Sequence, residues 1–155
     1  MRSPAKTVAG IVLLAVTVAS ALAALHLRDE LLRAGLAEGA GAGNVRVTVL
    51  DPDGRALFNG TVHLENGTVL LALDAAARAG NFTYGVREYD MGAYVHEIGG
   101  HEARGAHGWK YWVQRDGGWS LGDRSAQWYP VRDGDWVLWR WGTLDDSEPF
   151  GPQGP

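Results

Sequence analysis

The chain has 155 residues, no cysteine and a formal net charge of −4. The lack of cysteine excludes disulfides, thiolate metal sites and cysteine nucleophiles, and without a basic surplus nucleic acid is not an expected partner. Hydrophobic residues make up 46% of the sequence and seven residues are tryptophan, so we expect one packed domain of roughly a hundred residues rather than a disordered chain.

The N-terminal sequence has the pattern of a membrane span. Arg2 and Lys6 precede an uncharged, apolar run that continues to Leu25. About 20 apolar residues at 1.5 Å rise are long enough to cross a hydrocarbon core of roughly 30 Å. We therefore expect residues 1–6 to be a cytoplasmic n-region and residues 7–27 to be a single-pass signal anchor, a transmembrane helix that holds the rest of the chain on the extracytoplasmic side of the cell membrane.

A cleaved signal peptide is the alternative to the anchor. The stretch Ala21-Leu22-Ala23 has the small-x-small pattern of a cleavage site, so processing after Ala23 would also export the domain. A buried core helix is disfavoured, because Ala, Val and Leu occupy every face of the run. Residues 28–43 are predicted to be a tether, residues 44–141 the folded domain, and residues 142–155 a disordered acidic tail.

The domain combines several strand patterns with one helix pattern. Thr68 is a suitable N-cap for an Ala/Leu-rich helix from Val69 to Ala79, which Gly80 ends. Because one helix is too few for repeated βαβ units, we expect it to lie across one face of a mixed or antiparallel sheet, an α+β layout. The expected strands, from period-2 alternation and β-branched or aromatic content, are 44–50, 57–64, 82–87, 94–98, 109–114 and 136–141.

Four of these segments, in this order, resemble the domain family related to the C-terminal β-domain of transcobalamin and intrinsic factor, which recurs as a stand-alone surface module in prokaryotes. The segments are Val45–Leu50, Thr68–Leu73, Gly108–Val113 and Tyr129–Trp139. The resemblance implies a β-grasp-like fold and an extracellular binding or display domain. In the vitamin carriers it also implies a cobalamin-binding surface shared with a large helical domain, so cobalamin is a possible cofactor of this chain by resemblance alone.

Aromatic side chains crowd the second half of the domain. In the strands at 109–114 and 136–141, alternation places Trp109 and Tyr111 on one face and Trp112 on the other. One set of rings fills the core beneath the helix; the other covers the far face of the sheet or forms a platform for a flat ligand such as a sugar or a corrin ring. The residues that we expect at a ligand site are Tyr94, Trp109, Tyr111, Trp119, Trp128 and Tyr129.

A histidine-rich stretch offers weak candidates for a metal site. His96 and His101 flank Glu97 as in a zinc protease, but they stand five residues apart instead of four, and the intervening Gly99-Gly100 disfavours a helix. Together with His107 they are candidate ligands of a metal such as zinc. The alternative is a solvent-facing loop whose histidines are merely polar.

Enzymatic activity is not expected. Ser120 and Ser125 stand in neither a nucleophile elbow nor a helix start. Asp133 and Asp135 flank Gly134, which is better explained by a turn than by a pair of catalytic carboxylates.

Three asparagines begin Asn-x-Thr triplets and are candidates for N-glycosylation, namely Asn59, Asn66 and Asn81. The alternative is structural, because Asn-Gly favours turns and Thr68, the third residue of the second triplet, caps the helix.

The sequence therefore predicts a membrane-tethered extracytoplasmic binding module. Its ligand would be a small molecule or a protein partner, engaged through the aromatic strands and the stretch Gly92–Gly108. The alternative is a structural or adhesive surface protein that packs against copies or neighbours. A concave pocket beside exposed aromatic residues favours the first, and a flat surface with an open edge strand favours the second.

Overall fold

The computed structural model describes residues 43–143 and 145–150. The predicted n-region and anchor, and all of the predicted tether but its last residue, lie outside this range. Within the described part of the chain, no helix combines the length and apolar character needed to cross a membrane.

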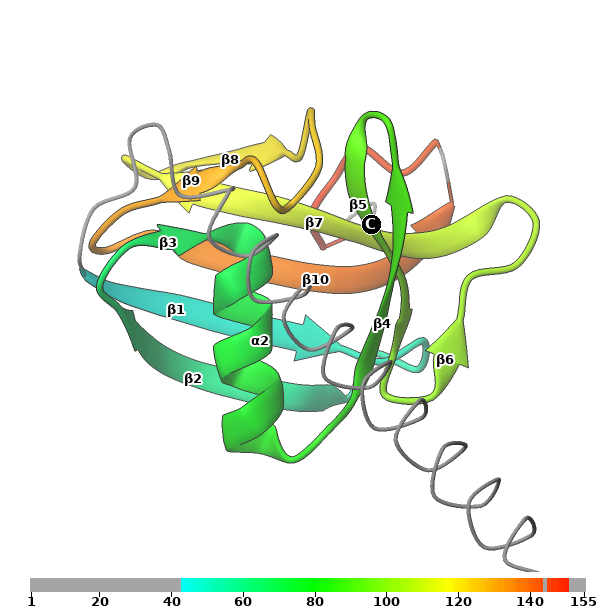
Figure 1. Cartoon of the computed structure of the whole chain (residues 1–155), viewed down its shortest axis with the longest axis horizontal. Coiled ribbons are helices and arrows are strands. Elements are labelled where there is room, and N and C mark those ends of the chain that lie inside the picture. Colours follow the sequence, from blue (N-terminus) through cyan, green and yellow to red (C-terminus); the bar gives the residue numbers. More distant parts are fainter. Residues whose placement is uncertain (1–42, 144, 151–155) are drawn as a thin grey trace, which may run out of the picture. The chain divides into compact units, whose positions relative to one another are not determined.

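A five-stranded mixed sheet forms the centre of the fold (Figure 1). Its strands, in spatial order, are β2 (Ala56–Leu64), β1 (Gly43–Leu50), β10 (Trp136–Thr143), β7 (His107–Arg115) and β8 (Gly118–Leu121). The first and last strands, β1 and β10, pair in parallel, whereas every other neighbour in this sheet is antiparallel. The turn that joins β1 to β2 is closed by a 2.9 Å hydrogen bond from the Gly54 amide to the Asp51 carbonyl.

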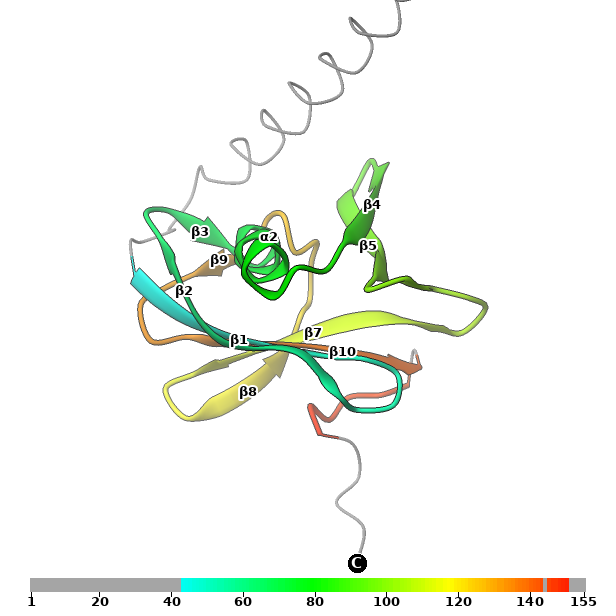
Figure 2. The ribbon, with the colours of Figure 1, turned by 90° about the horizontal axis from the view of Figure 1, so that it is seen from below.

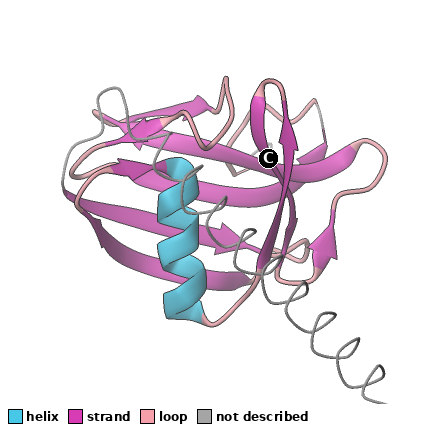
Figure 3. Ribbon diagram, viewed as in Figure 1, coloured by secondary structure: helices cyan, strands magenta, loops and turns pink. Residues whose placement is uncertain are grey.

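The helix α2 (Val69–Gly80) lies across one face of this sheet, called here the helix face (Figure 3). The Thr68 hydroxyl accepts a hydrogen bond from the Leu71 amide at 3.4 Å, and Asn81 ends the helix in the left-handed conformation. Leu73 and Val69 are fully buried, as are the inward-facing valines of β1. Burial of this apolar stripe, rather than helix propensity alone, holds the helix in place.

Two smaller sheets accompany the main one. A hairpin of β4 (Tyr84–Tyr89) and β5 (Gly92–Ile98) continues into the short β6 (His101–Glu102), and β3 (Gly67–Thr68) pairs with β9 (Pro130–Val131). Figure 2 shows that the hairpin stands on the same side of the main sheet as α2.

The predicted fold class is confirmed: the domain is α+β, with a mixed sheet and one helix in the described range. The helix and all six expected strands are present, with ends shifted by up to two residues. The sequence did not predict the short strands β3, β6, β8 and β9. Strands of two to four residues carry too little alternation to be recognised and exist only because a partner strand lies beside them.

The expected division of the aromatic rings between the two faces is also observed. Trp109 and Tyr111 pack on the helix face, where their ring centroids lie 5.5 Å from Trp141 and 5.2 Å from Trp139, respectively. Trp112 is fully buried on the opposite face, called here the far face.

The C-terminal segment differs from its prediction as a disordered tail over residues 142–155. Strand β10 continues to Thr143, and residues 145–150, called here the strap, are held against the far face (Figure 2). The physical reason is long-range: the side chains that hold the strap come from β7 and β10, so no local pattern in the tail reveals them.

Candidate functional site

A pocket of about 180 Å³ opens on the helix face between β5, β7 and the segment 121–126. Tyr94 of β5 and the rings of Trp109 and Tyr111 on β7 contribute most of its aromatic lining, and Trp139 of β10 completes it. Tyr94 is 40% exposed, whereas the other three rings are buried. The pocket is therefore an apolar hollow with one aromatic side chain at its solvent-facing rim.

The segment 121–129 is fixed because it serves the start of α2. The carbonyls of Ala126 and Tyr129 accept hydrogen bonds from the amides of Leu70 and Val69, both at 3.0 Å. These amides belong to the first turn of the helix, where the backbone N–H groups have no hydrogen-bond acceptor within the helix. The hydrogen bonds that satisfy the start of α2 therefore also hold this wall of the pocket in place.

The β4–β5 hairpin is clamped to this segment at its tip. The Ala93 amide donates to the Gln127 side chain at 3.0 Å, and the Ser125 hydroxyl donates to the Ala93 carbonyl at 2.7 Å. Gly92 has a positive φ of 101°, and a β-carbon there would come within 2.3 Å of the Trp128 indole nitrogen. Only glycine permits this close approach, so the hairpin wall of the pocket depends on it.

Two of the lining rings have their polar atoms already satisfied. The Trp109 indole donates to the His101 carbonyl at 2.8 Å, and the Tyr111 hydroxyl donates to the Arg124 carbonyl at 2.7 Å. Burial raises the pKa of Tyr111 well above the usual range, with the neighbouring Tyr129 adding to the shift. These residues consequently offer ring surface to a ligand, not a proton or a charge.

Three other polar groups lie at the pocket, and two of them have no hydrogen-bond partner in the described residues. The Tyr94 hydroxyl makes no hydrogen bond within residues 43–143 and 145–150, and its pKa is raised, first by partial burial and then by Tyr89. The buried Trp139 indole N–H also lacks an acceptor in the described structure. An unsatisfied buried donor costs about 1–3 kcal/mol. The third group is the exposed Arg124 guanidinium, which pairs with Asp123 at 2.9 Å.

A second, more polar hollow of about 310 Å³ adjoins the first and shares Leu121 and Arg124 with it. Tyr129 lines this hollow and packs against Tyr111 with ring centroids 5.7 Å apart. Ligand pockets typically enclose roughly 300–1,000 Å³. The two hollows together offer that much space, apolar at one end and lined by the Arg124–Asp123 ion pair at the other.

The structure brings together some of the predicted site residues and separates others. Tyr94, Trp109 and Tyr111 line the pocket, and Tyr129 lines the adjoining hollow. Trp128 covers the hairpin tip instead. Trp119 lies on the far face, with its ring centroid 5.0 Å from that of Trp136, so it belongs to a different surface.

The histidine candidates do not form a metal site. Within the described residues, no group of three or more His, Asp or Glu side chains is arranged to hold a metal ion. His96 faces Glu102 at 3.5 Å, while His101 and His107 are exposed on β6 and at the start of β7. The two carboxylates considered for catalysis also have structural roles, because Asp133 accepts from the Asn44 amide at 2.7 Å and Asp135 pairs with Arg115 at 2.6 Å.

All three sequon asparagines are exposed. Asn59 accepts a hydrogen bond from the Thr48 hydroxyl at 3.2 Å, and Asn81 forms the left-handed cap of α2 with φ of 53°. Two of them thus have structural roles that need no glycan. Glycosylation stays a prediction, compatible with the exposure of these side chains.

Sequence reasoning missed the part of the site that comes from segment 121–126. Arg124, Ser125 and Ala126 line the pocket, but their stretch has neither alternation nor a recognisable motif. Gly122 is the one local signal, since a β-carbon there would come within 2.2 Å of the Tyr111 ring. A glycine of this kind marks a close contact only after the facing ring is known.

No family model matches this sequence, and neither does any curated protein. Among solved structures, the chain is similar to haptocorrin, crystallised in complex with cobinamide, with a TM-score of 0.57 and 20% identity over 69% of this chain. The match spans 26% of the haptocorrin chain, about a quarter of its length. A proposed metal-binding protein from Ruminococcus gnavus matches with a TM-score of 0.47 and 16% identity, over 65% of this chain and 97% of the other. The likeness to haptocorrin shows a shared fold.

Proposed function

We propose that this domain is an extracytoplasmic module that binds a small ligand in the pocket between β5, β7 and the segment 121–126. The pocket is the observation that carries the proposal. It has an aromatic floor, one partly exposed aromatic side chain at its rim and few polar groups, which is the usual composition of a small-molecule site.

Two features of the pocket favour a flat or ring-shaped ligand with a polar edge. The rings of Tyr94, Trp109 and Tyr111 offer apolar surface for stacking. Arg124 and the Tyr94 hydroxyl supply a cation and a hydrogen-bonding group at the margin. Corrinoids and glycans both have this character. Because haptocorrin shares the fold and was crystallised with cobinamide, a corrinoid is the first ligand to test.

The proposal includes a tether. Residues 7–27 act as a signal anchor that holds the domain at the outer side of the cell membrane, and the basic residues Arg2 and Lys6 stay in the cytoplasm. An exported binding module needs only to capture and present its ligand, and no catalytic group is assigned.

Equilibrium dialysis of the full chain against cobinamide, cellotetraose and Zn²⁺ tests the proposal. We expect cobinamide or cellotetraose to bind in the micromolar range or tighter, whereas Zn²⁺ is the negative control, because no His, Asp or Glu of the described residues lines the pocket. Tyr94→Ala removes the rim ring and should weaken that binding at least tenfold, about 1.4 kcal/mol. Met91→Ala is the matched control, because Met91 is an 88% exposed residue of the same hairpin and does not line the pocket.

Two results would refute the proposed site. One is the absence of binding for both cobinamide and cellotetraose at millimolar concentration. The other is binding that Tyr94→Ala and Met91→Ala affect equally, which would place the ligand elsewhere.

A structural or adhesive role is the second candidate function, and one observation favours it. The nine-residue strand β2 stands at the edge of the main sheet, where a strand from another copy can add to it. Under this alternative, sedimentation would show micromolar self-association, and Thr61→Lys, which places a charge on the exposed edge, would abolish it. A monomeric full chain at these concentrations would exclude it.

A further inference from the structure

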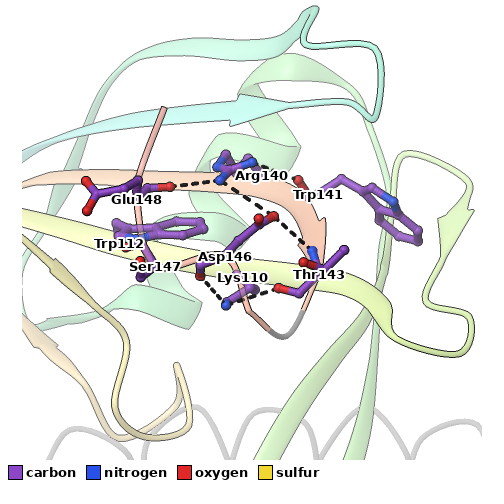
Figure 4. A network of polar contacts seen from close by, with 8 residues as sticks. All are labelled: Lys110, Trp112, Arg140, Trp141, Thr143, Asp146, Ser147 and Glu148. Carbon is purple, nitrogen blue, oxygen red and sulfur yellow. Dashed lines mark hydrogen bonds and ion pairs between the residues drawn. The ribbon is translucent and has the colours of Figure 1, made fainter. Parts of the chain in front are cut away.

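The far face of the main sheet holds the strap by its backbone (Figure 4). Three consecutive carbonyls of the strap each accept a hydrogen bond from a different side chain of the sheet. Lys110 Nζ donates to the Asp146 carbonyl, Trp112 Nε1 donates to the Ser147 carbonyl at 3.0 Å, and Arg140 donates to the Glu148 carbonyl at 2.8 Å. A surface that binds successive backbone carbonyls can bind the main chain of a peptide largely independently of its sequence.

The strap ends in an aromatic corner. Phe150 lies with its ring centroid 5.4 Å from Trp119 and 6.3 Å from Trp136, in edge-on and tilted arrangements. Behind them, the Arg46 guanidinium stacks 3.9 Å from the centre of the Trp136 ring. This corner selects an aromatic side chain two residues after the last carbonyl that the sheet binds.

The charges of the far face and of the strap are complementary. Arg46, Lys110 and Arg140 belong to the far face, and the strap brings Asp145, Asp146 and Glu148. Only Asp146 approaches a cation with its carboxylate, 3.7 Å from Arg140. The face therefore suits an acidic segment through its overall charge more than through individual ion pairs.

The strap does not use the whole surface. Phe150 is 51% exposed, so the aromatic corner is only half filled. Arg140 Nε is buried without an acceptor in the described part of the chain. A peptide with a larger or better-placed aromatic residue would gain contacts that the strap does not make.

We propose that the far face is a docking site for a short acidic peptide segment of a partner protein, with an aromatic residue after its acidic residues, and that residues 145–150 are the intramolecular occupant of this site. The partner segment replaces the strap carbonyl for carbonyl and places its own aromatic side chain against Trp119 and Trp136, where Phe150 now lies. This site lies on the opposite side of the sheet from the ligand pocket, so the two proposals stand or fall separately.

The test is competition between the strap and the same sequence supplied in trans. The probe is a fluorescein-labelled peptide, Asp-Asp-Ser-Glu-Pro-Phe, and its anisotropy is measured with the full chain and with a chain that ends at Thr143. A linked occupant competes at an effective concentration on the order of millimolar. We therefore expect the shortened chain to bind the peptide at least tenfold more tightly than the full chain does.

Two further variants locate the binding. In the shortened chain, Trp119→Ala should weaken it at least tenfold, and so should replacement of the peptide phenylalanine by alanine. A folded shortened chain that does not bind at millimolar peptide, or that binds no better than the full chain, would overturn the proposal.

If the shortened chain loses its far-UV circular dichroism, the full chain decides the question. Phe150→Ala loosens the strap and should strengthen peptide binding at least threefold. Asp145→Asn is the matched control, because it also changes the strap but removes a carboxylate with no contact to the sheet. Equal binding by the native chain, Phe150→Ala and Asp145→Asn would refute the docking site.

Discussion

At the scale of single residues, the buried carboxylate of Asp135 joins three parts of the domain. It is 3% exposed and accepts hydrogen bonds from Arg115 at 2.6 and 3.0 Å and from the Arg132 amide at 2.9 Å. Arg115 also donates to the Pro130 carbonyl at 3.1 Å, so one ion pair fixes β7, β9 and the turn before β10. The hydrogen bonds that Arg115 donates to Asp135 raise the pKa of Arg115, which keeps the guanidinium charged.

Asp135→Ala should destabilise the domain strongly. Removing one partner of a buried ion pair leaves the other charge uncompensated, and the loss is about 3–5 kcal/mol. Urea unfolding measures it. Asp53→Ala is the comparison, because Asp53 and Arg55 form an exposed pair at 3.6 Å and their separation should cost under about 1 kcal/mol. Equal losses in the two variants would contradict the role given to Asp135.

Asp146 makes the strap sensitive to acid. Its carboxylate accepts from the Thr143 amide at 2.9 Å, and this bond lowers its pKa, with the charges of Arg140 and Lys110 adding to the shift. A depressed pKa stabilises the folded strap above the ordinary aspartate value of about 3.9, and the stabilisation is lost as the pH falls through the lower folded value.

The strap should therefore loosen below about pH 4. The indole N–H resonance of Trp112, which reports its bond to the Ser147 carbonyl, should shift there while the far-UV circular dichroism stays constant. Asp146→Asn should remove this titration. A Trp112 resonance that stays fixed down to pH 2 in the native chain would disprove the acid sensitivity.

At the scale of elements, the β4–β5 hairpin decides whether the pocket has a wall. Gly92→Ala adds a β-carbon where the φ is 101° and the Trp128 indole nitrogen is 2.3 Å away. We expect the hairpin tip to leave the segment 125–128, so the Ala93 amide, now bonded to Gln127, should exchange its hydrogen at least tenfold faster. The amides of β1 should keep their protection. Unchanged exchange at Ala93 would show that the wall does not depend on this contact.

The same elements show what the sequence can predict. The valine alternation in β1 and the N-cap at Thr68 are local patterns, and they identified this strand and the helix, although the cap that ends the helix is Asn81 and not Gly80 as predicted. The segment 121–126 has no such pattern, because it is placed by the helix amides that it satisfies and by the Tyr111 ring that it covers. The side of the pocket formed by β5 and β7 was therefore predictable, through Tyr94, Trp109 and Tyr111. The side formed by segment 121–126 was not.

At the scale of the whole molecule, the two faces of the main sheet form two separate surfaces. The helix face carries the core, the hairpin and the pocket, and the far face carries the strap. Alternation along β7 and β10 makes this possible, because successive aromatic residues point to opposite sides. The sequence predicted that the aromatic rings of β7 and β10 divide between the two faces. It did not predict that residues 145–150 cover the far face, because these residues were expected to be disordered.

The proposed location of the domain depends on the predicted signal anchor, residues 7–27. Removal of residues 1–27 should shift the protein from the carbonate-washed membrane fraction to the soluble fraction without changing the unfolding midpoint of the domain. An intact chain recovered in the cytosolic fraction would contradict the extracytoplasmic proposal, whatever the pocket binds.

The central claim is that the helix-face pocket holds a small ligand, and the indole N–H resonances test it most directly. Trp109 and Trp139 line the pocket, whereas Trp112 and Trp136 belong to the far face. When cobinamide, cellotetraose and Zn²⁺ are added in turn to the ¹⁵N-labelled chain, cobinamide or cellotetraose should shift the resonances of Trp109 and Trp139 and leave those of Trp112 and Trp136 in place, with Zn²⁺ as the negative control. Shifts confined to the far-face pair, or no shift with either cobinamide or cellotetraose, would contradict the account.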